Sequence, residues 1–180
     1  MIVYFHNLEE PYVCTFDIEH DNGKLLQFAG IMFKHIGDGL YQVCRNINFY
    51  VNQKELSSFI TDFLDYDKSF LSEHGIDPEI VPEYFNKFVE GCNDDILFIS
   101  HGVYQDSLVL KDNGIDLYKY KRQCTYNLSK KVLSRMNKLS LAAVAEECGC
   151  AVIDEHNAYG DAIATACIFS YLLKKQGEKQ

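Results

Sequence analysis

Two acidic residues near the start of the chain have a spacing that could hold a metal ion. In Phe16-Asp17-Ile18-Glu19 the carboxylates stand two residues apart, so on a β-strand they project from the same face. Oxygen ligands of this kind suit hard divalent cations such as Mg²⁺. Taken alone, the pattern is weak. The chain has 26 acidic residues among 180, and Asp77-Pro78-Glu79 repeats the spacing, so a polar strand end is the simpler interpretation of Asp17.

A second candidate for chemistry lies near the other end of the chain. In the segment His156-Asn157-Ala158-Tyr159-Gly160-Asp161 a histidine precedes an aspartate by five residues. An imidazole is substantially neutral yet still basic near pH 7, which suits a general base. The small residues that follow, beginning with Ala162, allow a helix to pack closely on a sheet. His101 and Asp106 share the spacing, so a structural histidine in a loop before a helix remains the alternative.

The elements that must position these groups begin with three strands. β-branched and aromatic residues dominate 12–18 and 25–33, and the turn signal Asp21-Asn22-Gly23 separates them. Apolar and polar residues then alternate at period two through 41–51. Three consecutive antiparallel strands are the simplest account.

Helices and further strands are predicted for the rest of the chain. Residues 96–99 form an uninterrupted apolar run, as expected for a strand buried on both faces. The sequence therefore predicts an α/β fold, a mixed sheet of three antiparallel strands followed by parallel strands, with helices on both faces. The predicted helices cover 54–64, 78–89, 103–110, 128–136, 139–148 and 161–174, and a further short strand covers 116–120.

Four motifs, in their order along the chain, resemble those of the DEDDh 3′–5′ exonucleases. Phe16 to Glu19, then Leu26-Gln27-Phe28-Ala29-Gly30, then His101 to Asp106 after an apolar strand, and finally His156 to Asp161 are similar to the family's Exo I, Exo II and Exo III motifs. The family includes the proofreading epsilon subunit of DNA polymerase III and ribonuclease T, and the resemblance implies a ribonuclease H-like fold. The sister DEDDy type has a tyrosine where this chain has Asn157.

The resemblance also implies a role for each motif residue. Asp17 would bridge two divalent cations, Mg²⁺ or Mn²⁺, while Glu19 and Asp161 would complete the first site and Asp106 would support the second. His156 would act as the general base on the attacking water. Substrate contacts are expected from Ile18, His20, Phe28, His101 and Tyr104, with the rings of Phe28 and Tyr104 as candidates for stacking on a base.

Two positions depart from the family pattern. The family usually has a threonine after the first glutamate and an asparagine after the Exo II histidine, whereas this chain has His20 and Gly102. Neither is among the five residues expected to do chemistry. The departures therefore bear on substrate contacts and not on catalysis.

The expected substrate is the 3′ end of single-stranded nucleic acid, DNA in preference to RNA. A DNA polymerase subunit is a candidate partner, but the chain ends soon after the last motif helix, which favours a stand-alone enzyme or a catalytic fragment. Two alternatives stay open: a nuclease-fold module that regulates another protein by binding it, and a phosphoesterase for small phosphorylated molecules. Metal-dependent release of mononucleotides from an oligomer separates them.

Composition adds bounds to this interpretation. The length of 180 residues predicts one domain over 1–180, with 176–180 as a frayed tail. The net charge of −9 argues against broad non-specific binding to nucleic acid, although cations bound by clustered acids would reverse the field locally. Seven cysteines without a C-x-x-C pair predict reduced, buried thiols. The absence of a signal peptide or of a long apolar run predicts a cytoplasmic protein.

Overall fold

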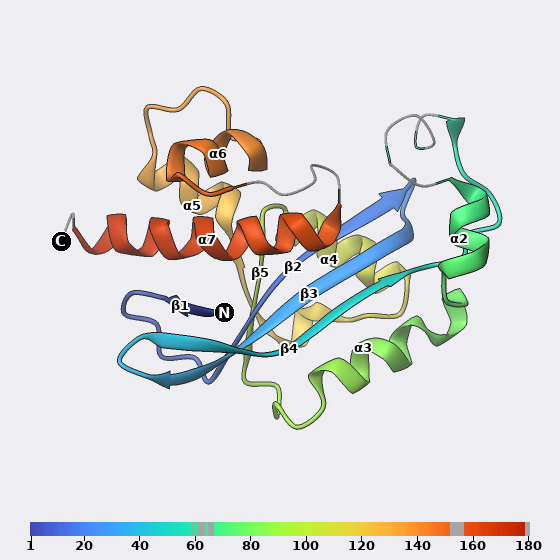
Figure 1. The fold of residues 1–180 in the computed structure, drawn as a ribbon, viewed down its shortest axis with the longest axis horizontal. Helices are drawn as coiled ribbons and strands as arrows, with labels where there is room; N and C mark the ends of the chain where they lie inside the picture. Colours follow the sequence, from blue (N-terminus) through green and yellow to red (C-terminus); the bar gives the residue numbers. More distant parts are fainter. Residues whose placement is uncertain (59, 61–63, 65–66, 152–156, 179–180) are drawn as a thin grey trace.

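The computed structural model describes the whole chain except residues 59, 61–63, 65–66, 152–156 and 179–180, and its centre is a mixed six-stranded sheet (Figure 1). The strand order is β1-β4-β3-β2-β5-β6. Neighbours are antiparallel from β1 to β2, and β5 and β6 add to β2 in parallel. The strands are β1 (Ile2–Tyr4), β2 (Tyr12–Asp21), β3 (Lys24–Gly37), β4 (Leu40–Tyr50), β5 (Ile96–Ser100) and β6 (Lys121–Cys124).

The turns between the first long strands follow from their sequence. Asn22 and Gly23 have φ values of 50° and 85°, and Asp38 and Gly39 have φ values of 50° and 71°. Asparagine, aspartate and glycine tolerate this left-handed region, so each pair closes a tight hairpin. The register between β2 and β3 shifts between Glu19 and His20, and the pairing continues to Asp21 and Lys24.

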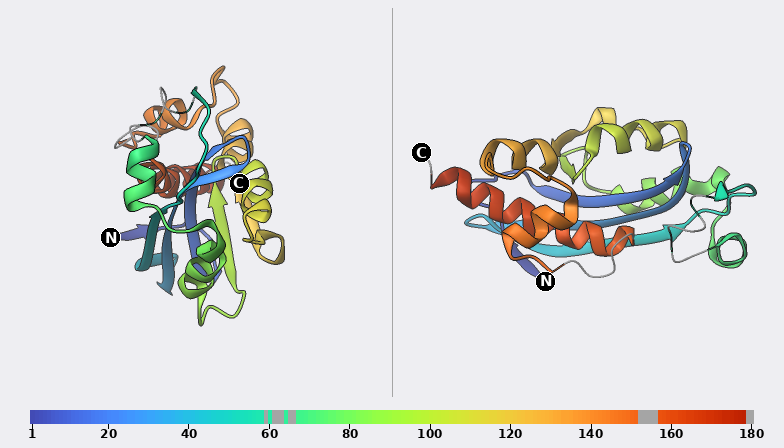
Figure 2. Two further views of the ribbon diagram at one scale, coloured as in Figure 1. Left: turned by 90° about the vertical axis from the view of Figure 1, so that its right-hand side faces the viewer. Right: turned by 90° about the horizontal axis from the view of Figure 1, so that it is seen from above.

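Helices cover both faces of the sheet, as expected from the sequence. The helices α5, α6 and α7 group together on one face (Figure 2), and α3 and α4 pack against the other. Among the described residues, no helix combines the length and hydropathy of a transmembrane span. The helical elements are α2 (Lys68–His74), η1 (Pro78–Ile80), α3 (Val81–Val89), α4 (Val103–Asp112), η2 (Leu117–Lys119), α5 (Thr125–Val132), α6 (Leu141–Cys148) and α7 (Ala158–Gly177).

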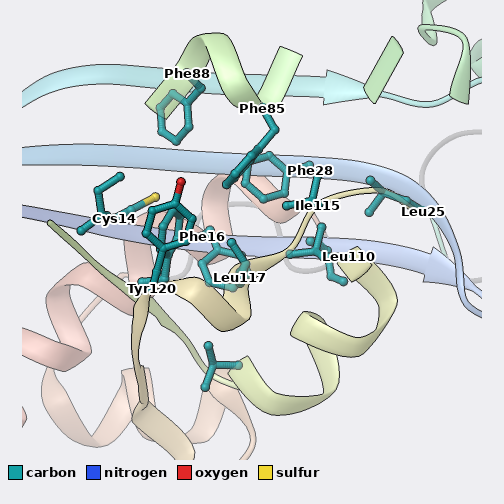
Figure 3. Close-up of a cluster of buried hydrophobic side chains, with 14 of the residues drawn as sticks. Cys14, Phe16, Leu25, Phe28, Phe85, Phe88, Leu110, Ile115, Leu117 and Tyr120 are labelled. Atoms are coloured by element: carbon teal, nitrogen blue, oxygen red, sulfur yellow. The ribbon is translucent and has the colours of Figure 1, made fainter. Parts of the chain in front are cut away.

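Strict alternation along β2 divides its side chains between the two faces. Cys14, Phe16 and Ile18 join the cluster formed with α3 and α4, where Phe28 and Phe85 also lie (Figure 3). The odd-numbered side chains point to the α7 face, where Val13 packs in the second cluster. Asp17 and Glu19 therefore face α7, and β5, with all five residues buried, supports β2 from the side.

The predicted boundaries need correction in the second half of the chain. Residues 117–119 form a 3₁₀ turn and the strand is Lys121–Cys124, because Asp116 accepts a hydrogen bond from the Tyr118 N–H and stops an extended run. The following helix starts at Thr125 and ends at Val132, not at 136. The last helix runs from Ala158 through Gly177, so it begins before and ends after the predicted 161–174. Of the predicted helix over 54–64, residues 54–57 are not helical, residues 58 and 60 are, and residues 59 and 61–63 lie outside the described residues.

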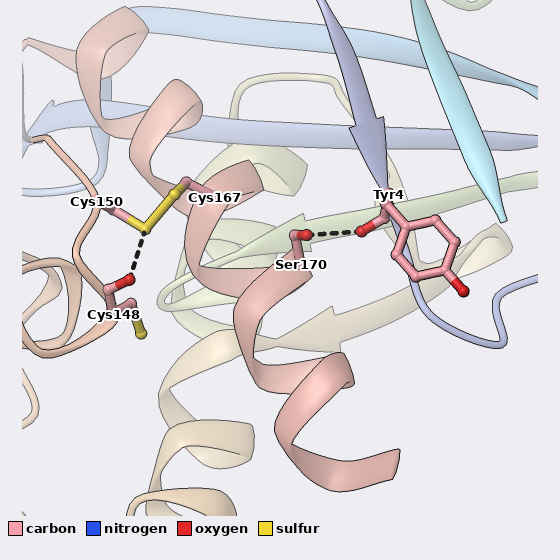
Figure 4. Close-up of a disulfide and its surroundings, with 5 residues drawn as sticks. All are labelled: Tyr4, Cys148, Cys150, Cys167 and Ser170. Atoms are coloured by element: carbon pink, nitrogen blue, oxygen red, sulfur yellow. Dashed lines mark hydrogen bonds between the residues drawn. A yellow bond between two sulfur atoms is a disulfide. The ribbon is translucent and has the colours of Figure 1, made fainter. Parts of the chain in front are cut away.

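A disulfide corrects the expectation that all cysteines are reduced. Cys150 and Cys167 are bonded, with their Cα atoms 6.0 Å apart (Figure 4). The sequence could not pair them, because Cys150 follows α6 and Cys167 lies on α7, and only the packing of the two helices brings them together. The free cysteines Cys14, Cys92 and Cys124 are buried as predicted, but Cys44 is exposed and Cys148 is half-buried.

Candidate active site

Three carboxylates from two distant segments meet where β2 approaches the start of α7. Asp17 and Glu19 come from β2, and Asp161 lies in the first turn of α7. One carboxylate oxygen from each residue lies within 4.8 Å of those of the other two, and all three side chains are partly buried. The structure therefore brings together the first, second and last acids of the predicted set.

The fourth acid, Asp106, approaches from α4. It lies in the first turn of that helix, and its Oδ2 accepts a hydrogen bond from the hydroxyl of Ser100, the last residue of β5. Its charge raises the pKa of both Asp17 and Glu19. Asp106 thus belongs to the same electrostatic site, although it is not one of the three residues whose oxygens form the tightest group.

Burial is the main reason that the pKa values of these acids are raised, and at Asp17 and Glu19 the neighbouring carboxylates add to it. The pKa of Asp17 is well above its ordinary value, first through burial and then through the negative charges of Asp106, Glu19 and Asp161. Burial, followed by the same kind of repulsion, raises the pKa of Glu19 to about 8. Burial also raises the pKa of Asp106. Oxygen donors gathered at this cost are the set that a divalent cation satisfies, so the residues present fit a metal site.

Two neighbouring strands hold the start of α7 in place. Asn157 caps the helix by accepting a hydrogen bond from the Tyr159 N–H at 3.0 Å. Gln27 of β3, completely buried, accepts another from the Ala158 N–H at 3.3 Å. The side chain of Tyr50 at the end of β4 hydrogen-bonds to Asn157. Hydrogen bonds with Gln27 on β3 and Tyr50 on β4 therefore fix the start of the helix from which Asp161 projects.

His101 is fixed by hydrogen bonds at both ring nitrogens. Its Nε2 lies 2.7 Å from the carbonyl oxygen of Leu139, which can only accept, so Nε2–H donates. Burial lowers the pKa of His101, which favours the neutral ring and leaves Nδ1 to accept from the Thr125 hydroxyl at 2.9 Å. The ring thereby ties the end of β5, just before α4, to α5 and to the segment before α6.

The other predicted substrate contacts lie in different surroundings. His20 and Tyr104 are exposed, and the charge of His20 lowers the pKa of Asp106, so His20 lies beside the acids. Ile18 is only 7% exposed. The structure corrects the expectation for Phe28: its ring is completely buried and packs against the rings of Phe16, Phe49 and Phe85, so it belongs to the core and is not open to a base.

His156, the predicted base, lies outside the described residues, so its role remains a prediction. Sequence reasoning also missed two residues of the site. Gln27 was visible as a polar residue inside an apolar strand, which indicates a buried hydrogen bond. Ser100 directly precedes the predicted His101 motif, but only the fold shows that its hydroxyl reaches the Asp106 carboxylate.

Comparison with known families and proteins agrees with this geometry. The RNase_T family model, described as "Exonuclease", matches residues 14–169, a span that includes all four acids. A curated relative, the PolC-type DNA polymerase III of Caldanaerobacter subterraneus subsp. tengcongensis, is 25% identical over 185 residues. The alignment covers 96% of this chain and 12% of the polymerase, so the chain spans about an eighth of that relative's length.

Solved structures share the fold. Escherichia coli Exonuclease I in complex with a dT13 oligonucleotide superposes with a TM-score of 0.74 at 12% identity, over 94% of this chain and 42% of that one. Exonuclease X in complex with 5′ overhanging duplex DNA superposes with a TM-score of 0.69 at 17% identity, over 92% of this chain and 93% of that one. Identities this low establish a common architecture, which is the ribonuclease H-like arrangement expected from the sequence.

Proposed function

The chain belongs to the RNase_T exonuclease family, and from that membership we propose that it is a metal-dependent 3′–5′ exonuclease acting on the 3′ end of single-stranded DNA. The observation that carries the proposal is the convergence of Asp17, Glu19 and Asp161 within 4.8 Å, with Asp106 beside them. The resemblance to DEDDh exonucleases rested on these same acids. Together they form a binding site for divalent metal ions, for which we propose two ions, Mg²⁺ or Mn²⁺.

Each acid has a place in this proposal that follows from its position. Asp17, Glu19 and Asp161 would hold one ion between them, and Asp106, with Asp17, would hold the second. When bound, the ions supply positive charge that stabilises the negative charge gathering on the phosphate oxygens in the transition state. Ser100 donates to the Asp106 carboxylate and so fixes its orientation. Gln27 and Asn157 fix the helix start from which Asp161 projects.

His156 would accept the proton of the attacking water in this proposal. The resemblance to the Exo III motif assigns it this role, because it stands five residues before Asp161 in the sequence. His101 does not serve this purpose, because its Nε2–H donates to Leu139 and its Nδ1 is bonded to Thr125. Exposed Tyr104 on α4 and His20 beside Asp106 remain the proposed contacts to the terminal nucleotides.

The choice of DNA is supported by the relatives. The curated relative is a DNA polymerase, and the structural neighbours hold DNA oligonucleotides or duplex DNA. The matched region of a PolC-type polymerase also supports a role at 3′ ends formed in replication or repair, in the cytoplasm, either alone or with a polymerase. The alternatives, a protein-binding regulator and a phosphoesterase for small molecules, predict no release of nucleotides from an oligomer.

A directional digestion experiment tests the proposal. The purified protein is incubated with oligothymidylate carrying a dye at its 5′ end, and with the matching RNA, in Mg²⁺, in Mn²⁺ or in chelator. We expect a ladder of shortened, still labelled DNA and release of nucleoside 5′-monophosphates only when a metal is present. Immediate release of the dye on a mononucleotide would show that digestion starts at the 5′ end. The absence of products with either metal would overturn the proposed activity.

A further inference from the structure

Charge is distributed unevenly along this acidic chain. Residues 117–145 contain seven of its 17 lysine and arginine residues and none of its 26 acidic residues. The remaining sequence is correspondingly more acidic than the net charge of −9 suggests. A polyanionic substrate is repelled by most of this protein, so the location of the basic stretch bears on where such a substrate can lie.

Part of the basic stretch forms an exposed surface on α5 and the segment that follows it. Helix α5 lies against α7 (Figure 1) and is amphipathic, with Thr125, Leu128 and Ser129 buried. Its opposite side exposes an aromatic ring followed, about one helical turn later, by two adjacent lysines. We name this the basic α5 surface, and its exposed residues are Tyr126, Lys130, Lys131, Arg135 and Lys138.

The basic α5 surface begins next to the proposed active site. The ring of Tyr126 packs edge-on against the ring of His101, with centroids 5.8 Å apart and planes at 82°. His101 immediately precedes Gly102, the N-cap of α4, and Asp106 lies in the first turn of that helix. Tyr126 is 43% exposed, so an open aromatic ring stands beside His101 at the start of the basic α5 surface.

The opposite side of the site has the wrong charge for a nucleic acid. Tyr50, which hydrogen-bonds to Asn157 at the start of α7, packs against Phe70 of α2. The segment 67–79 around α2 and η1 exposes the acidic residues Asp67, Glu73, Asp77 and Glu79, whereas its exposed basic residues are Lys68 and His74. A strand that left the site on this side would meet a repulsive surface.

The cations of the basic α5 surface are also available to a ligand. Lys119 and Lys121, earlier in the same stretch, pair with Asp94 at 3.6 Å and with Glu10 at 3.4 Å. In contrast, Lys130, Lys131, Arg135 and Lys138 form no ion pair with any residue that the structure describes. Lys130 and Lys131 stand in the last turn of α5, where they favour the helix dipole, but that interaction leaves their ammonium groups in solvent.

The geometry points to a role for the basic α5 surface in binding the phosphate backbone of the substrate strand on the 5′ side of the cleaved bond, with Tyr126 stacking on a base as the strand leaves the active site. This inference rests on the proposed exonuclease function and adds the path of the substrate. It commits to nucleic acid as the partner, since a row of cations next to an exposed aromatic ring is the pattern that binds single strands without sequence preference.

The test compares two charge-neutralised double variants. Lys130→Gln/Lys131→Gln removes two cations from the surface, and the control Lys34→Gln/Lys87→Gln removes two exposed cations from β3 and α3. For each, the ratio of kcat/KM on a long oligothymidylate to kcat/KM on a thymidine dinucleotide is measured over a range of salt concentrations. The dinucleotide is long enough to contact only the acids, so the ratio measures the contribution of the basic α5 surface to activity on the long strand.

We expect the Lys130/Lys131 variant to lower this ratio roughly tenfold at low salt and to make its logarithmic salt dependence shallower by about 1.4, the effect of two lost phosphate contacts on a single strand. Tyr126→Ala should lower the ratio by a similar factor and Tyr126→Phe should restore it. The Lys34/Lys87 control should match the wild type.

The outcomes separate the two proposals. Equal ratios and salt slopes for the Lys130/Lys131 variant and its control would overturn the path over α5 while leaving the exonuclease intact. Equal losses in both double variants would mean a general charge effect, which also overturns it. If the wild type hydrolyses neither substrate in Mg²⁺ or Mn²⁺, the exonuclease proposal itself fails. Circular dichroism spectra identical to the wild type's show that each variant is folded.

Discussion

The side chain of Gln27 on β3 holds the first turn of α7, because its Oε1 accepts a hydrogen bond from the Ala158 N–H at 3.3 Å. Its Nε2 donates to Asn48 Oδ1 on β4 at 2.9 Å. The amide is completely buried and is bonded on both sides. Ala158 lies three residues before Asp161, so a glutamine from the sheet helps to determine where a metal-binding carboxylate stands.

Replacing Gln27 with leucine should reduce both stability and activity. The change leaves the buried Ala158 N–H without its partner, which costs about 1–3 kcal/mol, whereas the exposed Asn48 side chain can bond to water. We expect urea unfolding to show a loss in that range and kcat to fall roughly tenfold, since Asp161 loses its fixed position.

Gln53→Leu is the matched control for this variant. Gln53 also donates a side-chain hydrogen bond, but its acceptor is the Leu25 carbonyl on β3, at 3.0 Å, and not a group of α7. A similar loss of stability with unchanged kcat is expected. If the two variants lose kcat equally, Gln27 acts through general stability and not through the position of Asp161.

Ser100→Ala should lower activity without removing any proposed metal ligand. The Ser100 hydroxyl donates to Asp106 Oδ2 and lowers the pKa of that carboxyl against the effect of burial. Its loss frees the carboxylate to rotate and raises its pKa further, so we expect roughly tenfold lower kcat and a higher Mn²⁺ concentration for half-maximal rate. Ser107→Ala, which removes a buried hydroxyl on α4 that donates to the Val103 carbonyl, should keep the wild-type metal dependence.

His156→Ala tests the proposed general base. Loss of a general base costs roughly 10²–10⁴-fold in rate, whereas the four acids that would hold the metal ions remain. We therefore expect a large fall in kcat with unchanged Mn²⁺ binding, measured by calorimetry on the metal-free protein. His101→Ala is the contrasting variant. Because it removes the hydrogen bonds to Thr125 and Leu139, it should lower the melting temperature. Unchanged turnover in His156→Ala would remove that residue from the mechanism.

The sequence predicted the sheet from local patterns, and it offered the four acids as candidates through their resemblance to the DEDDh motifs. Alternation at period two places Asp17 and Glu19 on one face, and an uninterrupted apolar run identifies β5. It could not predict contacts between distant segments, such as Gln27 with Ala158, or the bond between Cys150 and Cys167. Those depend on how α7 lies across the sheet, which no local pattern encodes.

The same limit explains the smaller errors. Phe28 stands in the motif strand beside the acids, but the alternation that points Asp17 toward α7 also points neighbouring rings into the opposite core, where Phe28 is completely buried. The short β6 was misplaced because Asp116 and the 3₁₀ turn after it interrupt an apolar run. Tertiary packing decided the position of Phe28 and a turn decided the position of β6, although the hydrophobicity of both segments was judged correctly.

Reduction of the Cys150–Cys167 bond should destabilise the protein. The bond closes a loop with a sequence separation of 17 residues, and a loop of this size contributes about 3 kcal/mol in the chain-entropy model. We expect dithiothreitol to lower the free energy of unfolding by about this amount, and Cys150→Ser/Cys167→Ser to show the lower value with or without it. Cys44→Ser, at an exposed free thiol, should respond to the reductant as the wild type does.

The metal-free protein should become less stable as the pH rises from about 4.5 to about 8. The folded state raises the pKa of Glu19 from 4.5 to about 8, and that of Asp17 also lies well above its ordinary value. In this range the unfolded chain has released protons that the folded protein still binds, so the free energy of unfolding falls with increasing pH. Below pH 4.5 the contribution of Glu19 to the free energy of unfolding is fully present.

Thermal unfolding in chelator across this pH range measures the effect, and Mg²⁺ should restore stability near pH 8, because the ion balances the charges that repel one another. The Glu19→Gln variant has no carboxyl group to titrate at this position, so its metal-free stability should depend less on pH and should gain less from Mg²⁺. The exposed Glu79→Gln should behave like the wild type. A metal-free wild type whose stability rises toward pH 8 would contradict the mutual repulsion of the acids, and with it the reason for expecting a metal ion among them.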